Sequence, residues 1–125
     1  MPQVEAGACG KPVIGIRAMG MRDTIVHGKT GLLASVAMEV RLKETTLGES
    51  EGYEHGHRVV FKKPRVSDYR ASVHDIADHL MKLMKDAGLR RSLGEAARKR
   101  VVEMFDYRVV ARRLVQLLGD RLGIS

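Results

Sequence analysis

Glu5-Ala-Gly-Ala-Cys-Gly-Lys-Pro-Val-Ile-Gly-Ile16 is the stretch of sequence that decides the fold. Its first half is typical of a helix end, because Gly10 tolerates the left-handed conformation that follows a helix and Pro12 cannot continue one. Residues 13–16 are a short apolar run rich in β-branched side chains, as in a covered parallel strand. A helix that leads directly into such a strand is half of an α/β crossover unit. The stretch therefore predicts an α/β fold.

The residues after this strand predict a loop, a turn and a second strand. Residues 17–22 form a loop at the carboxyl end of the first strand, the edge at which open α/β sheets bind ligands. Asp23 favours a single helical turn over residues 23–26, because a carboxylate is stabilised near a helix start. Residues 27–31 contain two glycines and predict a turn, and residues 32–34 predict the next short strand.

Residues 35–69 predict an inserted β-hairpin with a long tip. Residues 38–43 alternate apolar and polar, residues 48–56 are polar and rich in glycine, and residues 58–62 supply a second strand that Pro64 ends. Two interpretations stay open. The hairpin is either a surface elaboration, such as a dimerisation flap, or an acceptor-recognition flap. The acidic residues of such a flap are Glu49, Glu51 and Glu54.

Residues 70–125 predict three helices that cover one face of a small sheet. Ser72 caps the first helix, and Asp75 stands three residues later, as in a capping box. Residues 86–88 end that helix, and Asp106 begins the third. Apolar residues recur at helical spacing in all three. The positions expected inside are Val73, Ile76, Ala77, Leu80, Leu83 and Met84, then Leu89, Leu93, Ala96, Ala97, Val101 and Met104, and finally Val109, Val110, Leu114, Leu117 and Leu118.

Length and composition describe a chain that can bury one modest core. It has 125 residues, of which 44% are hydrophobic, and a single cysteine, which excludes an internal disulfide and suits a reducing compartment. No apolar run approaches the about 18–20 residues of a membrane span, and residues 1–5 lack the features of a signal peptide. We therefore expect a soluble, cytoplasmic chain.

The net charge of +7 arises from 22 basic and 15 acidic residues. Such an excess favours anionic partners, but the sequence shows no interleaved aromatic residues and no nucleic-acid-binding motif, so we expect no nucleic acid. A solvated helix surface and contact with an anionic membrane surface both stay open. The basic residues lie mostly on predicted helical faces: Arg90, Arg91, Arg98, Lys99, Arg100, Arg108, Arg112 and Arg113.

Other reactive side chains give weak signals. The five histidines do not show the spacing of a metal site, since zinc needs three or four converging ligands, and we expect no metal. Cys9, among small residues at a helix end, is expected to be packed and inert. The triplet at residues 28–30 is a fragment of a phosphate-binding loop without its preceding glycine, and a turn explains it better.

Two parts of the chain, residues 5–34 and about 70–118, carry a family resemblance. The order and spacing of the first part resemble the pattern E-A-M-A-C-G-K-P-V-I-G-T-x-A-G-G-x-x-D-x-I-x-D-G-x-T-G-L-L of glycosyltransferase family 4 (group 1). The matching positions are Glu5-Ala6, residues 8–15, Arg17-Ala18, Gly20, Asp23, Ile25-Val26 and residues 28–33. The second part is similar to the closing helices of that family in Leu89-Arg90-Arg91, Gly94-Glu95-Ala96-Ala97-Arg98 and Val101.

The resemblance implies a partial Rossmann-like α/β unit from the carboxyl-terminal domain of the GT-B fold. Together with the residue pattern of the segment at 35–69, which the resemblance does not cover, it predicts two short parallel strands, an inserted β-hairpin and three carboxyl-terminal helices. Residues 1–125 would form a single partial domain. Within it, residues 1–34 would be the remnant of the donor site, residues 35–69 the inserted hairpin and residues 70–125 a helical cap.

The resemblance also implies a site. Glu5 matches the second of two glutamates that flank a nucleotide-diphosphate sugar, and it would hydrogen-bond the donor ribose; the alternative is a helix-surface carboxylate without a ligand. Arg17 and Gly20, in the loop at the strand end, would face the same donor. Met19 departs from the pattern, because the family has the first glycine of a pair there. No catalytic residue and no cofactor is implied, since the nucleotide sugar is a substrate.

Two classes of function follow. The first is the carboxyl-terminal segment of a retaining glycosyltransferase, inactive as an isolated chain because the first glutamate, the phosphate-binding segments and the acceptor domain of the family would stand before Met1. The second is a non-catalytic oligomerising or interaction protein derived from that scaffold. A homodimer would form through the unpaired edge of strand 13–16 or through the hairpin at residues 38–62.

Overall fold

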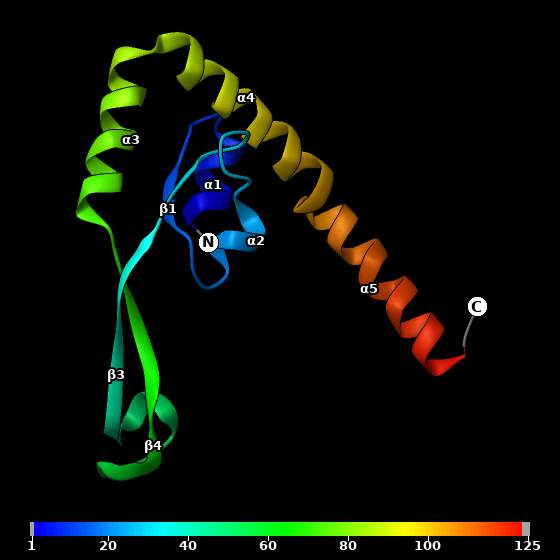
Figure 1. Cartoon of the computed structure of the whole chain (residues 1–125). Helices are drawn as coiled ribbons and strands as arrows, with labels where there is room; N and C mark the ends of the chain where they lie inside the picture. The colour runs from blue at the N-terminus through cyan, green and yellow to red at the C-terminus, as the bar shows by residue number, and fades with distance from the viewer. Residues whose placement is uncertain (1, 124–125) are drawn as a thin grey trace.

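Five α-helices, a short 3-10 helix and four strands make up the part of the chain that the computed structural model describes, residues 2–123. The first elements form a small core, from which the hairpin projects on one side and the last helix on the other (Figure 1). In chain order the elements are α1 (Pro2–Ala8), β1 (Ile14–Ile16), α2 (Met21–Thr24), β2 (Leu32–Ala34), β3 (Val36–Leu47), η1 (Glu49–Glu51), β4 (His57–Ala71), α3 (Val73–Lys85), α4 (Ala87–Met104) and α5 (Tyr107–Leu122).

The two short strands pair in parallel, with Ile14 opposite Leu32 and Ile16 opposite Ala34. Gly10 has φ +68°, the left-handed conformation predicted for the residue after the first helix. The predicted helix, glycine stop and parallel strand are therefore confirmed. The intervening helical turn, α2, begins two residues earlier than predicted.

The core lies where α3 and α4 pack on the strands. Leu93 is 1% exposed and lies with Leu32 and Leu83 in one cluster, against which Ile14 and Leu89 pack. Burial of a leucine side chain contributes about 1.5–3 kcal/mol, so a cluster of this size gives a modest core. Among residues 2–123, no helix is both long enough and apolar enough to cross a bilayer.

The hairpin is longer than the sequence predicted, and Pro64 does not end its second strand. β4 continues through Pro64 to Ala71 and pairs antiparallel with β3. The register shifts at this point, because Leu42 pairs with Arg65 whereas Glu44 pairs with Val60. Pro64 thus lies in a bulge, where its missing N–H removes no ladder hydrogen bond.

The base of the hairpin is tied to α3. The hydroxyl of Ser72 accepts a hydrogen bond from the N–H of Asp75 at 3.2 Å, which confirms Ser72 as the helix cap. The predicted return bond of a capping box is not made, because the Asp75 carboxylate accepts instead from the backbone N–H of Ser35 at 2.9 Å and from its hydroxyl. These bonds favour the ionised carboxylate and lower the pKa of Asp75.

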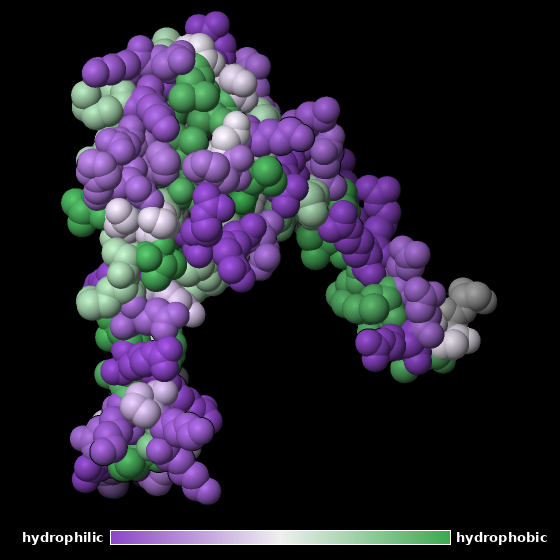
Figure 2. All heavy atoms as spheres, in the orientation of Figure 1, coloured by the Kyte–Doolittle hydropathy of each residue, from purple (hydrophilic) through white to green (hydrophobic). Residues whose placement is uncertain are grey.

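The prediction that three helices cover the sheet is wrong for the third. α5 has no buried residue, and Leu114 and Leu118 on it are 53% and 48% exposed. Figure 2 shows its apolar atoms on the open surface of the projecting arm. On α3, Leu83 is buried as predicted, but Val73 and Met84 are 80% and 72% exposed because they lie on the outer side of that helix.

Candidate functional site

The loop at the carboxyl end of β1 is held close to β2. The backbone N–H of Arg17 donates to the carbonyl of Ala34 at 2.8 Å, so the strand pairing extends into the loop. Ala18 is buried beneath it. Met19 adopts φ +55°, whereas Gly20 has φ −65° and precedes α2. The left-handed turn therefore falls on the residue that departs from the family pattern, and the adjacent glycine takes a conformation open to any residue.

A hollow of about 270 Å³ opens between this loop and the base of the hairpin. Arg17 in the loop and Arg22 in the first turn of α2 contribute two guanidinium groups, and the hairpin contributes Glu39 and Tyr69. Glu39 and Tyr69 stand directly opposite each other on β3 and β4. The remaining lining residues are Ala18, Met19 and Val36.

Of the three residues predicted to bind the donor, only Arg17 lines this hollow. Gly20 is exposed in the same loop but does not line it. Glu5 is exposed on α1 and is not among the lining residues either. This hollow therefore does not bring Glu5 and the loop together, and the donor role of all three residues stays a prediction.

Glu39 and Tyr69 could not be found by sequence reasoning, and Arg22 was not singled out. Glu39 and Tyr69 are separated by 29 intervening residues, and only the shifted register of the hairpin places them opposite each other. The alternation at residues 38–43 indicated a strand, but not which residue of the distant strand would pair with it. Arg22 was signalled only by its place in a loop at a strand end.

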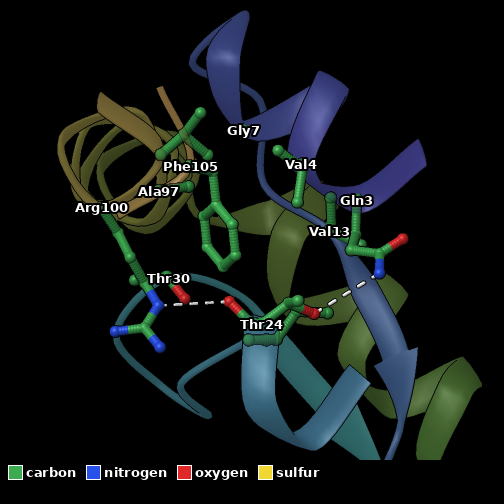
Figure 3. A pocket seen from close by; sticks show the side chains of 11 residues that line it. Gln3, Val4, Gly7, Val13, Thr24, Thr30, Ala97, Arg100 and Phe105 are labelled. Atoms are coloured by element: carbon green, nitrogen blue, oxygen red, sulfur yellow. Dashed lines mark hydrogen bonds between the residues drawn. The ribbon is translucent and has the colours of Figure 1, made fainter. Parts of the chain in front are cut away.

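A second, much smaller gap lies between α1, α2 and α4 (Figure 3). Gln3 donates from Nε2 to the hydroxyl of Thr24 at 3.5 Å, and Arg100 donates from Nε to the Thr24 carbonyl at 3.3 Å. Phe105 points into the same gap (Figure 3). Its volume of about 20 Å³ is room for one water molecule. This gap belongs to the packing of the helices and cannot take a substrate.

A more open hollow of about 380 Å³ lies between the turn at residues 26–30 and α4. It carries three cationic side chains, from Lys29, Lys99 and Arg100. Arg100 is already engaged, since its Nη2 donates to the carbonyl of Asp23 at 3.0 Å. Lys99 lies 3.9 Å from the carboxylate of Glu103, a surface pair of small energetic value.

Two histidines form hydrogen bonds with the backbone of Leu33, the central residue of β2. Nδ1 of His27 accepts from the N–H of Leu33 at 2.8 Å, and Nε2 of His79 lies 3.0 Å from the Leu33 carbonyl, to which it donates. Desolvation lowers the pKa of His27, and the positive charges of Arg17, His79 and Lys82 lower it further. The neutral ring that this favours is the form that can accept a hydrogen bond at Nδ1.

Within residues 2–123, no three His, Cys, Asp or Glu side chains converge as a metal site would require. Cys9, which was expected to be packed, is exposed at the end of α1. The apolar neighbours that would cover it are absent because α1 turns Gly7, not Cys9, toward α4.

The chain is similar to part of two larger proteins. It is 32% identical over 102 residues to N-acetyl-alpha-D-glucosaminyl L-malate synthase of Bacillus anthracis, and the alignment covers 82% of this chain and 18% of that enzyme. Sucrose-phosphate synthase from Thermosynechococcus elongatus matches all of the chain with a TM-score of 0.64 and 22% identity, over 23% of its own length. At that identity the structural similarity concerns the fold alone. No protein-family profile matches the chain.

Proposed function

Since this chain is homologous to a small part of the family 4 glycosyltransferases, as its motifs predicted, we propose that it is the carboxyl-terminal segment of a retaining enzyme that transfers a sugar from a nucleotide-diphosphate sugar to an acceptor. The observation that carries the proposal is the stretch from Glu5 to Leu33, whose family pattern coincides with a helix, a left-handed glycine and two parallel strands. We place this activity in the cytoplasm, a reducing compartment that suits a single unpaired cysteine.

In this proposal Glu5 accepts hydrogen bonds from the ribose hydroxyls of the donor. Glu5 is one of the exposed residues of α1. A carboxylate accepts two hydroxyl donors well, and bonds to a charged group contribute about 1.5–3 kcal/mol. Arg17 and Gly20 would lie on the donor side of the same sheet edge.

We further propose that the 125 residues alone do not transfer sugar. Departure of a nucleotide diphosphate requires preorganised positive charge or N–H donors where the negative charge develops. Glu5 is an anion, and the guanidinium groups of Arg17 and Arg22 lie in a hollow that Glu5 does not line. Binding without turnover is therefore the expected behaviour.

The test is calorimetric titration of the chain with uridine and guanosine diphosphate sugars. The variant Glu5→Ala should bind about 10- to 100-fold more weakly, from the loss of charged hydrogen bonds. Glu95→Ala is the matched control, because Glu95 is an exposed carboxylate on another helix, α4. Unchanged affinity of Glu5→Ala would remove the ribose role. Release of nucleotide diphosphate that depends on Glu5 would contradict the proposed lack of turnover.

A second candidate, a non-catalytic oligomerising protein, is favoured by the hairpin. β3 and β4 form a sheet of two strands that leaves both outer edges unpaired within residues 2–123. A two-stranded ribbon is only marginally stable in water, and a second copy added at an edge would complete its hydrogen bonds. The edge of β1 offers the same kind of pairing over three residues. Contact with an anionic membrane surface stays an alternative because of the net charge of +7.

A further inference from the structure

We propose that the hollow between residues 17–22 and the base of the hairpin is a binding site for a small hydroxylated oxyanion, a molecule that carries a phosphate or carboxylate group and at least one hydroxyl. The site joins Arg17 and Arg22 with Glu39 and Tyr69. That this site serves as a substrate subsite of a transferase rests on the proposed function. The binding itself does not, and it can be measured in this chain without a donor.

In this proposal Arg17 and Arg22 bind the phosphate or carboxylate group of the ligand. Both guanidinium groups line one hollow, and within residues 2–123 neither forms an ion pair or a side-chain hydrogen bond. The backbone near both arginines is held in place, because the Arg17 N–H donates to the Ala34 carbonyl, Ala18 is buried, and Arg22 lies in the helical turn α2. Planar guanidinium groups match the two oxygens of a carboxylate or phosphate, and such charged bonds are about twice as strong as neutral ones.

In this proposal Glu39 and Tyr69 of the hairpin bind the hydroxyl group of the ligand. Oε2 of Glu39 receives a hydrogen bond from Nη2 of Arg41 at 2.8 Å, which partly neutralises the carboxylate and leaves Oε1 as an acceptor. Tyr69, its directly opposed partner, adds a phenol that donates or accepts. The hollow therefore has positive charge on one wall and hydroxyl-binding groups on the other.

The volume of the hollow sets the size of the ligand. Pockets for drug-sized molecules measure about 300–1,000 Å³, and this hollow measures about 270 Å³. A complete nucleotide sugar is too large for it, whereas a hydroxy acid or a sugar phosphate of a few carbons fits. The inserted hairpin would thus supply one wall of a site for a small second substrate, which agrees with its interpretation as an acceptor-recognition flap, although the wall is its base and not its acidic tip.

The test is an NMR titration of the isotope-labelled chain with inorganic phosphate, glycerol 3-phosphate and glycerate. We expect saturable shifts confined to residues 17–22, 36–39 and 69, with glycerol 3-phosphate or glycerate bound more tightly than inorganic phosphate. Glycerol 3-phosphate carries hydroxyl groups on a carbon chain that inorganic phosphate lacks, and glycerate carries a carboxylate in place of the phosphate. The tighter binder of glycerol 3-phosphate and glycerate therefore shows whether the site prefers a phosphate or a carboxylate.

Variants separate the two walls of the site. Arg17→Gln or Arg22→Gln should weaken all three ligands about tenfold, the value of one charged hydrogen bond. Arg91→Gln, which removes an exposed arginine on α4, is the matched control and should change nothing. Glu39→Gln should leave inorganic phosphate bound and abolish the preference for glycerol 3-phosphate. Shifts spread over all basic residues, or equal weakening by Arg91→Gln, would overturn the proposal.

The outcome is distinguishable from that of the donor experiment. Loss of donor binding in Glu5→Ala with no oxyanion binding in the hollow would reject the subsite and retain the transferase. Oxyanion binding that depends on Arg17 and Arg22, with no donor binding at all, would retain the subsite and reject its role in sugar transfer.

Discussion

Met19 is a single residue at which the chain holds an unfavourable backbone conformation. Its φ of +55° lies in the left-handed region, which costs an ordinary L-residue about 1–2 kcal/mol. The side chain is 63% exposed, so it recovers little of that energy by packing. The family pattern has glycine at this position, and the structure supplies the physical reason: the loop needs a residue there that accepts a positive φ.

Met19→Gly should therefore stabilise the chain by up to about 1 kcal/mol, the relieved strain being partly offset by the greater entropy of glycine in the unfolded state. Urea unfolding of both chains measures the difference. Gly20→Ala serves as the control, because Gly20 has φ −65° and an added Cβ meets no atom within 4 Å. Destabilisation by Met19→Gly would mean that the methionine side chain contributes packing which its exposure does not suggest.

At the scale of elements, sequence patterns predicted which helices and strands form, but not always which other element packs on each of them. The glycine, proline and β-branched signals near β1 are local, and the strands predicted at residues 13–16 and 32–34 are confirmed, the first of them beginning one residue later, at Ile14. The apolar stripe on α5 was equally clear, yet its leucines are exposed. A periodic stripe shows which face of a helix is apolar, whereas the element that covers this face is decided by contacts distant in sequence.

The candidate site was likewise predictable where it depends on local sequence, but not where it depends on pairing between distant strands. The loop after β1 was recognised from the rule that ligands bind at the carboxyl ends of parallel strands, so Arg17 was found. Glu39 and Tyr69 depend on a bulge next to Pro64, which shifts the pairing of the two hairpin strands by several residues. Proline was interpreted as a strand end, but proline is also accommodated at a bulge, and sequence alone does not separate these outcomes.

The crossing of α4 over the end of α1 gives a prediction at this scale. A Cβ added to Gly94 would lie 2.0 Å from the carbonyl oxygen of Gly10, a backbone atom that cannot move aside. Gly94→Ala should therefore destabilise the chain by about 2–4 kcal/mol, beyond the cost of ordinary overpacking. Thermal unfolding measures this loss. Gly88→Ala, near the start of α4 with a closest contact of 3.3 Å, should cost far less, and equal losses would contradict the close crossing.

At the scale of the whole molecule, the chain consists of a small core with two projections (Figure 1). The buried apolar residues belong to the strands, the loops between them, α3 and α4, while the hairpin and α5 extend away from them. Both projections carry exposed large apolar side chains, such as Val60 on the hairpin and Leu114 on α5. Surfaces of this kind favour association with another chain or another copy.

Self-association through the hairpin is the expected outcome. Size-exclusion chromatography with light scattering should give a homodimer at high micromolar concentration. Val60→Lys should shift it toward monomer, because a lysine on an edge strand opposes strand pairing. Leu114→Lys is the control, since Leu114 is 53% exposed against 57% for Val60. If only Leu114→Lys dissociates the dimer, the interface lies on α5, and a monomeric parent chain would reject self-association.

The contact between α1 and α4 also determines the order in which the molecule can fold. Gly7 packs against Ala97 and Val101, and Arg98 donates to the carbonyl of Ala8, so the contact closes a loop of 90 residues. The entropy of closing a loop grows with its length, whereas the hairpin needs only its own strands. During synthesis α1 emerges before α4, so it cannot dock until α4 has been made. The segment that specifies the fold is thus expected to be among the last to reach its native position.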